Sequence, residues 1–177
     1  MIKHCLVIIA MLSVFAVSTV RAQDAVPSTV NTIKQSYAAI KMNLTKAADK
    51  MPEDGYGFQP TKEERNFGGW VAHVADTQMR LCSGIAGAQK NINAASKTSK
   101  ADLVAALKES FDMCDAVYEG LTDANAGDPV PSFRGQAARL AVLANNVIHD
   151  NECYGSMAVY LRLKGIVPPS SEPRPQH

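Results

Sequence analysis

The longest helical pattern in the chain lies at residues 132–164, SFRGQAARLAVLANNVIHDNECYGSMAVYLRLK. Its apolar side chains recur every three or four residues, the spacing that gives one buried stripe on an α-helix. The stripe consists of Leu140, Leu143, Val147, Tyr154, Ala158 and Leu161, and Gly165 directly after the segment suits a helix end. Such a stripe has to be covered by neighbouring elements, so the segment predicts a packed helix.

Three more segments carry the same spacing, at residues 28–50, 66–85 and 99–121. Ser99 with Asp102 resembles a capping box at the start of the third of them. Residues 123–131, rich in Gly, Pro, Asp and Asn, are expected to be a loop. No segment alternates between apolar and polar residues over a useful length, as a half-buried strand would. The predicted fold class is therefore all-α, a four-helix bundle with room for at least one crossover connection.

The first residues have the pattern of a targeting signal. Lys3 and His4 precede an apolar run from Cys5 to Val20 that contains no charge, and small residues flank Arg21. This order is typical of a secretory signal peptide, here residues 1–22, which predicts a periplasmic or secreted protein. A transmembrane anchor is the alternative, although the run is shorter than the roughly 20 residues that a membrane span prefers.

The rest of the chain is predicted to be one domain. Residues 23–167 are long enough for one hydrophobic core, and residues 168–177, which include four prolines, are expected to be an extended and mobile tail. The net charge of +1 gives no electrostatic footprint for nucleic acid. Haem-attachment, nucleophile-elbow and Walker motifs are absent from the sequence.

The middle of the segment at 132–164 is unusually polar and carries the candidate ligands. His149 and Cys153 are four residues apart, so they share one face of the predicted helix. His73 lies on the second predicted helix, whereas His177 lies in the tail. Three ligands from two helices would leave one coordination position of a metal open, as in reactive sites. The alternative is a hydrogen-bonded structural histidine beside a cysteine that packs as a small hydrophobe.

Three stretches resemble a known family. HDNECYGSMAVYLRLKGIVPPSS at 149–171 is similar to the C-terminal signature of the DinB/YfiT-like family of helical metalloproteins. NFGGWVAHVADTQ at 66–78 is similar to its second-helix motif, and FQPTKEERNF at 58–67 to the stretch before it. The resemblance extends over about residues 28–171, and its C-terminal part is the most specific.

The resemblance implies a four-helix bundle with a divalent metal ion, zinc or nickel, held by three histidines. By position these ligands are His73, His149 and Cys153, so a cysteine replaces one histidine. A thiolate can take the place of an imidazole, since Zn–S is about 0.2–0.3 Å longer than Zn–N. Its negative charge is expected to acidify a bound water less and to favour soft metals. The alternative is a degenerate site that binds no metal.

Cysteine pairing bears on this site, because Cys82, Cys114 and Cys153 remain after signal cleavage. Cys82 and Cys114 lie on the inward stripes of consecutive predicted helices, so we predict a disulfide between them. A bond from Cys153 to either one would remove it as a ligand, and three free thiols are a further alternative.

Two classes of function follow from these expectations. One is an exported metal-dependent hydrolase or transferase that acts on a small molecule of unknown identity. The other is a non-catalytic envelope module with a degenerate metal site, which the absence of an evident general base favours. Neither involves nucleic acid, and some relatives of this family dimerise, so a homodimer is one expected state.

Overall fold

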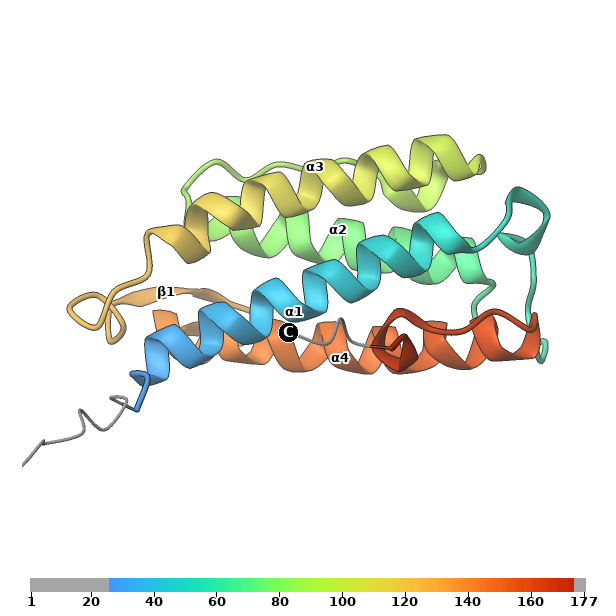
Figure 1. Cartoon of the computed structure of the whole chain (residues 1–177). Coiled ribbons are helices and arrows are strands. Elements are labelled where there is room, and N and C mark those ends of the chain that lie inside the picture. The colour runs from blue at the N-terminus through green and yellow to red at the C-terminus, as the bar shows by residue number, and fades with distance from the viewer. Residues whose placement is uncertain (1–25, 174–177) are drawn as a thin grey trace, which may run out of the picture.

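The computed structural model describes residues 26–173 and confirms the predicted four-helix bundle (Figure 1). Its helices are α1 (Thr29–Lys50), α2 (Phe67–Ile85), α3 (Lys100–Glu119) and α4 (Arg139–Leu163). Smaller elements are β1 (Pro129–Ser132), β2 (Gly135–Ala138) and the 3₁₀ turns η1 (Glu53–Gly55), η2 (Ala94–Ser96) and η3 (Pro169–Ser171). The predicted signal peptide and His177 lie outside the described residues.

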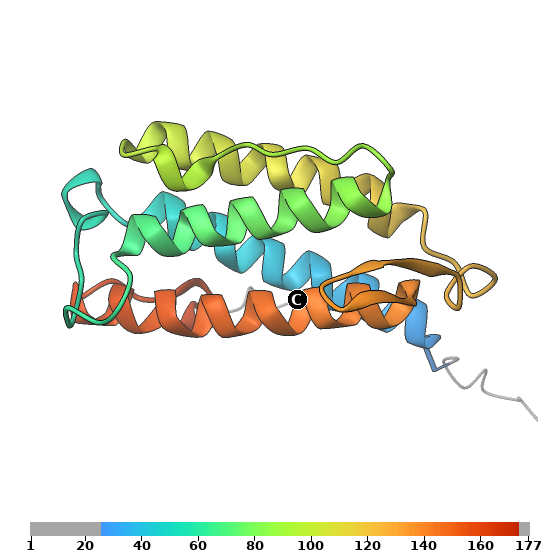
Figure 2. The ribbon, with the colours of Figure 1, turned by 180° about the vertical axis from the view of Figure 1, so that it is seen from behind.

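The helices run in an up-down-down-up order. In Figure 1, α1 and α4 run in one direction and α2 and α3 run in the other. The connection at residues 86–99 therefore returns along the whole bundle before α3 begins, and Figure 2 shows this return from behind. The order places α2 against both α3 and α4. The two helices that carry the predicted ligands are thus neighbours, although 76 residues separate His73 from His149.

The core forms where the four apolar stripes meet. Its largest side chains, all less than 2% exposed, include Ile40, Leu44, Phe67, Phe111, Leu143, Met157 and Leu161. Tyr37 of α1 stacks on Tyr118 of α3 with ring centroids 3.7 Å apart. Burying one large apolar side chain contributes about 1.5–3 kcal/mol, so these contacts fix the helices against one another. Among the described residues, none of the helices is long and apolar enough to cross a membrane.

The start of the fourth helix was predicted incorrectly. Residues 132–138 do not continue the helix; instead β1 and β2 form a hairpin with Ser132 paired to Gly135. Gly135 has φ of +110°, which a right-handed helix does not allow. The helix begins at Arg139, whose amide donates to the Asp128 carbonyl at 2.8 Å. Carbonyls of the preceding loop thus accept the first helix amides in place of a capping side chain. Neither these contacts nor the strand pairing produces a periodic sequence pattern from which they could be predicted.

The predicted mobile tail is also corrected for residues 168–173. Pro168 and Pro169 are buried, and the hydroxyl of Tyr154 donates to the Ser170 side chain at 2.9 Å. Lys50 of α1 pairs with Glu172 at 2.6 Å. Proline rings carry apolar surface without an amide to satisfy, so this segment packs on α1 and α4. Residues 174–177 lie outside the described part of the chain.

Ser99 caps the start of α3 and pairs with Asp102 as predicted, which gives a first testable prediction. The Ser99 hydroxyl accepts from the Asp102 amide at 3.1 Å and donates to the Asp102 carboxylate at 2.7 Å. Replacing Ser99 by Ala should lower the free energy of unfolding by about 1 kcal/mol, because an orphan helix amide loses its partner. Urea denaturation measures this, with the exposed neighbour Thr98→Ala as the control. Equal stability of both variants would contradict a capping role.

Candidate metal centre

Two neighbouring helices bring the three predicted ligand residues together. His73 of α2 and His149 of α4 face each other with their Nε2 atoms 3.1 Å apart. Cys153, one turn after His149, has its Sγ 3.7 Å from the same Nε2. The three donor atoms all lie within 4.8 Å of one another. Cys153 is buried and both histidines are half-buried, so the cluster lies at the edge of the bundle interior.

These spacings fit a divalent metal of tetrahedral preference. With metal–nitrogen bonds of about 2.0–2.1 Å and a metal–sulfur bond of about 2.3 Å, two nitrogens lie about 3.3 Å apart. A nitrogen and a sulfur then lie about 3.6 Å apart. The separations of 3.1 Å and 3.7 Å in the protein are close to these values. Two imidazoles and a thiol are also the donor set that zinc accepts in proteins.

A buried carboxylate holds His149 in an orientation suited to this role. Asp150 is fully buried, and its Oδ1 lies 3.6 Å from His149 Nδ1. Among the described residues, neither of these two buried atoms has a hydrogen-bond partner. A proton on Nδ1 is therefore favoured on the carboxylate side, which leaves the Nε2 lone pair for the centre. Asp150, and after it Cys153, raises the pKa of His149 to about 10, so without a metal ion the ring keeps a second proton on Nε2. A metal cation at Nε2 would displace that proton and be favoured by the same two groups.

Asp150 is in turn held by a polar network inside the core. Gln78 of α2, fully buried, donates to Asp150 Oδ2 at 2.6 Å. Its Oε1 accepts from Asn146 at 2.9 Å, and Asn146 also donates to the Tyr118 hydroxyl at 3.2 Å. Buried polar groups are costly unless they are paired, so this chain of contacts fixes the rotamers around the site.

Sequence reasoning did not single out Gln78 and Asp150. Asp150 directly follows His149, and adjacent helical residues project about 100° apart, so the two side chains gave no pattern to recognise. Asp76 of α2, three residues after His73, has a structural role. Its carboxylate accepts from the amides of Ala94 and Ala95 at 2.7 and 3.0 Å and holds η2 against α2.

The predicted disulfide is present. Cys82 of α2 and Cys114 of α3 are bonded, with their Cα atoms 5.1 Å apart. Gln78 Oε1 lies 2.9 Å from Cys114 Sγ, so the bond borders the polar network. Within residues 26–173, Cys153 is the free cysteine. A bond from Cys153 to Cys82 or Cys114, the outcome that would have removed a ligand, is therefore excluded in this state.

Two arginines give the approach to the site a positive potential. Burial lowers the pKa of His73, and the charges of Arg65 and Arg80 lower it further. The Arg65 guanidinium lies over the partly buried Trp70 ring, 5.0 Å from its centroid. His73 opens into a cavity of about 710 Å³ and His149 into one of about 390 Å³.

Fold and site together define a class, a four-helix bundle that gathers two imidazoles and a thiol between two of its helices. The chain belongs to the DinB superfamily, whose family model matches residues 37–156.

Solved structures support the fold. The chain is similar to a DinB-like protein of Bacillus cereus ATCC 10987, with 17% identity and a TM-score of 0.65 over 78% of this chain and 95% of that one. It is also similar to a DinB-like protein of Bacillus subtilis, with 20% identity and a TM-score of 0.65 over 81% of this chain and 100% of that one. At these identities the likeness concerns the fold alone. No curated protein matches the chain.

Proposed function

We propose that this protein is an exported DinB-like metalloprotein that binds one zinc or nickel ion through His73, His149 and Cys153. One observation carries the proposal: three donor atoms from two helices lie within 4.8 Å of one another. Three protein ligands leave a fourth position open, the pattern of a reactive rather than a structural site. The function this supports best is a metal-dependent hydrolase or transferase acting on a small molecule.

Each residue has a distinct task in this proposal. His73 and His149 contribute neutral imidazoles, and Cys153 contributes a thiolate whose charge offsets part of the charge of the cation. Asp150 faces Nδ1 of His149 at 3.6 Å and favours a proton on that nitrogen, while Gln78 keeps the carboxylate in place. A bound divalent cation supplies Lewis acidity and acidifies a bound water. The adjoining cavities, about 710 and 390 Å³, are large enough for a small-molecule ligand.

Export is part of the same proposal. The predicted signal peptide at residues 1–22 supports it, and so does the disulfide between Cys82 and Cys114, since disulfides persist in oxidising compartments. The periplasm or the extracellular space is the location that we propose.

A second candidate, a non-catalytic binding module, is favoured by a specific observation. Among the described residues that line the cavities of His73 and His149, the only carboxylate belongs to Asp76. Both of its oxygens already accept backbone amides, so it is not a free general base. In this alternative the bundle binds a metal or a small molecule without chemistry.

Metal analysis of untagged protein tests the proposal. The mature protein, loaded with zinc or nickel and dialysed, should retain about one equivalent of metal, because three converging ligands bind far more tightly than surface groups. Titration of free thiols should find Cys153 protected when the metal is bound and reactive after chelation, whereas the disulfide stays unreactive in both states. A folded protein that retains neither metal, with Cys153 equally reactive in both states, would refute the metal site.

A further inference from the structure

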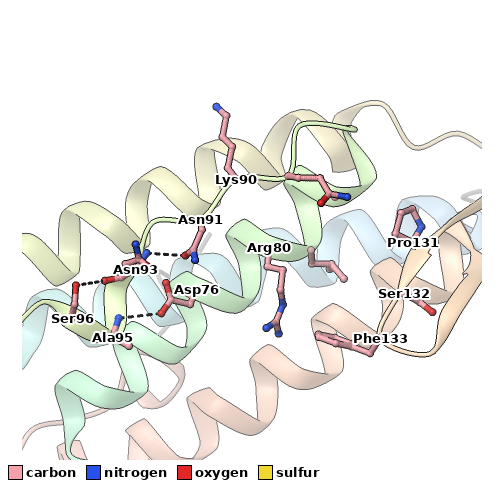
Figure 3. A pocket seen from close by; sticks show the side chains of 13 residues that line it. Asp76, Arg80, Lys90, Asn91, Asn93, Ala95, Ser96, Pro131, Ser132 and Phe133 are labelled. Carbon is pink, nitrogen blue, oxygen red and sulfur yellow. Dashed lines mark hydrogen bonds between the residues drawn. The ribbon is translucent and has the colours of Figure 1, made fainter.

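Three cavities meet beside the candidate metal centre. The largest, about 960 Å³, lies between α2, the return segment at residues 86–99 and the turn of the β hairpin (Figure 3). It shares Arg80 with the cavity of His73 and shares Phe133 with the cavity of His149. A molecule seated against Arg80 and Phe133 would therefore lie in a cavity that adjoins those of both histidines.

The charges that line these cavities are one-sided. Their basic residues are Arg65, Arg80, Lys90, Lys97 and Arg134. Their acidic residue is Asp76, whose two oxygens already accept backbone amides. The chain as a whole carries a net charge of only +1, so this excess of positive charge is local. A concave surface of one sign raises the local concentration of ligands of the opposite sign.

Arg80 is the residue best placed to hold such a ligand. Its guanidinium lies 5.0 Å from the centroid of the Phe133 ring, and Figure 3 shows the two side chains facing each other from α2 and the hairpin turn. Stacking on a ring occupies the face of a guanidinium and leaves its N–H edge free to donate. In the part of the chain that the structure describes, that edge has neither a carboxylate partner nor a protein hydrogen bond.

Phe133 provides an apolar surface in the same cavity, beside the Arg80 guanidinium. It is 72% exposed at the tip of the hairpin, although large aromatic side chains contribute most when they are covered. An unpaired guanidinium edge beside an uncovered ring matches a ligand that has an anionic group and an apolar body.

We propose that these cavities bind a small organic anion, whose carboxylate or phosphate is held by Arg80 and whose apolar part packs against Phe133. The inference rests on the proposed function, since the anion would be the substrate or ligand of the same centre. The cavity volumes, about 390 to 960 Å³, are those of small-molecule sites.

Titrations of the metal-free protein with three probes test the inference: benzoate, phenylphosphate and the neutral benzyl alcohol. Amide chemical shifts of wild-type protein should move around Arg80 and Phe133 with at least one of the anions, and that anion should bind more tightly than benzyl alcohol. Arg80→Gln should weaken its binding by about tenfold or more, because a charge-assisted hydrogen bond is lost. The matched control is Arg162→Gln on the exposed surface of α4, which should bind as wild type does.

Two further variants separate the parts of the site. Phe133→Ala should weaken binding of the aromatic anion and leave that of inorganic phosphate unchanged. Arg80→Lys should restore part of the affinity that Arg80→Gln loses, since the charge remains without the planar fork. The preferred anion tells whether the natural ligand carries a carboxylate or a phosphate.

The inference is wrong if neither anion binds more tightly than benzyl alcohol, or if Arg80→Gln and Arg162→Gln weaken binding equally. Zinc binding by wild type and Arg80→Gln is measured in parallel and should be equal. Failure of zinc binding with Arg80-dependent anion binding intact would refute the metal site alone. Zinc binding without any Arg80-dependent anion binding would refute the anion site alone.

Discussion

Replacing His149 by Ala should lower the affinity for zinc by more than about 100-fold. Mutating a residue that only orients a metal ligand already lowers metal affinity about 10–100-fold, and removing the ligand itself should cost more. His149 stands at the middle of the cluster, 3.1 Å from His73 Nε2 and 3.7 Å from Cys153 Sγ. Without it, one imidazole and one thiol remain on different helices. Competition against a chromophoric chelator measures the affinity, and circular dichroism during heating checks that the bundle is intact.

Asp150→Asn is a second variant, for which a smaller loss of zinc affinity is expected. Asn keeps the shape and the hydrogen bond to Gln78 but removes the charge that faces His149 Nδ1, at 3.6 Å. Zinc affinity should then fall about 10–100-fold, between wild type and His149→Ala. Asp102→Asn, on the exposed start of α3, is the control and should bind zinc as wild type does. An affinity unchanged in both His149→Ala and Asp150→Asn would place the metal elsewhere.

Reduction of the disulfide between Cys82 and Cys114 should lower the free energy of unfolding by about 3–4 kcal/mol. The two cysteines are 32 residues apart, and the loop they close contains the whole return segment at residues 86–99. Cross-linking restricts the unfolded chain more as the closed loop becomes longer, and a separation of 32 residues corresponds to this magnitude. The bond therefore stabilises the packing of α2 against α3.

Urea denaturation with and without a reductant measures this effect. Comparing oxidised with reduced wild type leaves both sulfur atoms in the core, so no cavity is created. The double variant Cys82→Ala, Cys114→Ala is the control, since a reductant should not change its stability. A loss of less than about 1 kcal/mol in reduced wild type would show that the unfolded chain is already restricted there.

Much of the bundle could be predicted from local sequence. The helical stripes and the N-terminal cap at Ser99 are present as expected. These features depend on side chains three or four residues apart, which interact inside one helix whatever surrounds it. The predicted ligand residues also converge. That prediction needed the resemblance to a family, because periodicity alone does not show that His73 of α2 lies beside His149 of α4.

The β hairpin and the packing of residues 168–173 were predicted incorrectly for a shared reason. The start of α4 depends on carbonyls of Asp128 and Ala126, which accept the amides of Arg139 and Leu140. Glu172 is held by Lys50, 122 residues earlier in the chain. Interactions of this kind leave no periodic trace, because each partner alone resembles a loop residue.

Local sequence is sufficient for the four helices, their buried faces, the inward cysteines Cys82 and Cys114, and the i, i+4 spacing of His149 and Cys153. These are properties of neighbouring residues on one helix, and local geometry is sufficient for them. The support of His149 by Asp150 and Gln78, and the contact of Arg80 with Phe133 at the wall of a cavity, depend on tertiary packing. Those arrangements join segments far apart in the chain, and their geometry follows from how the helices pack.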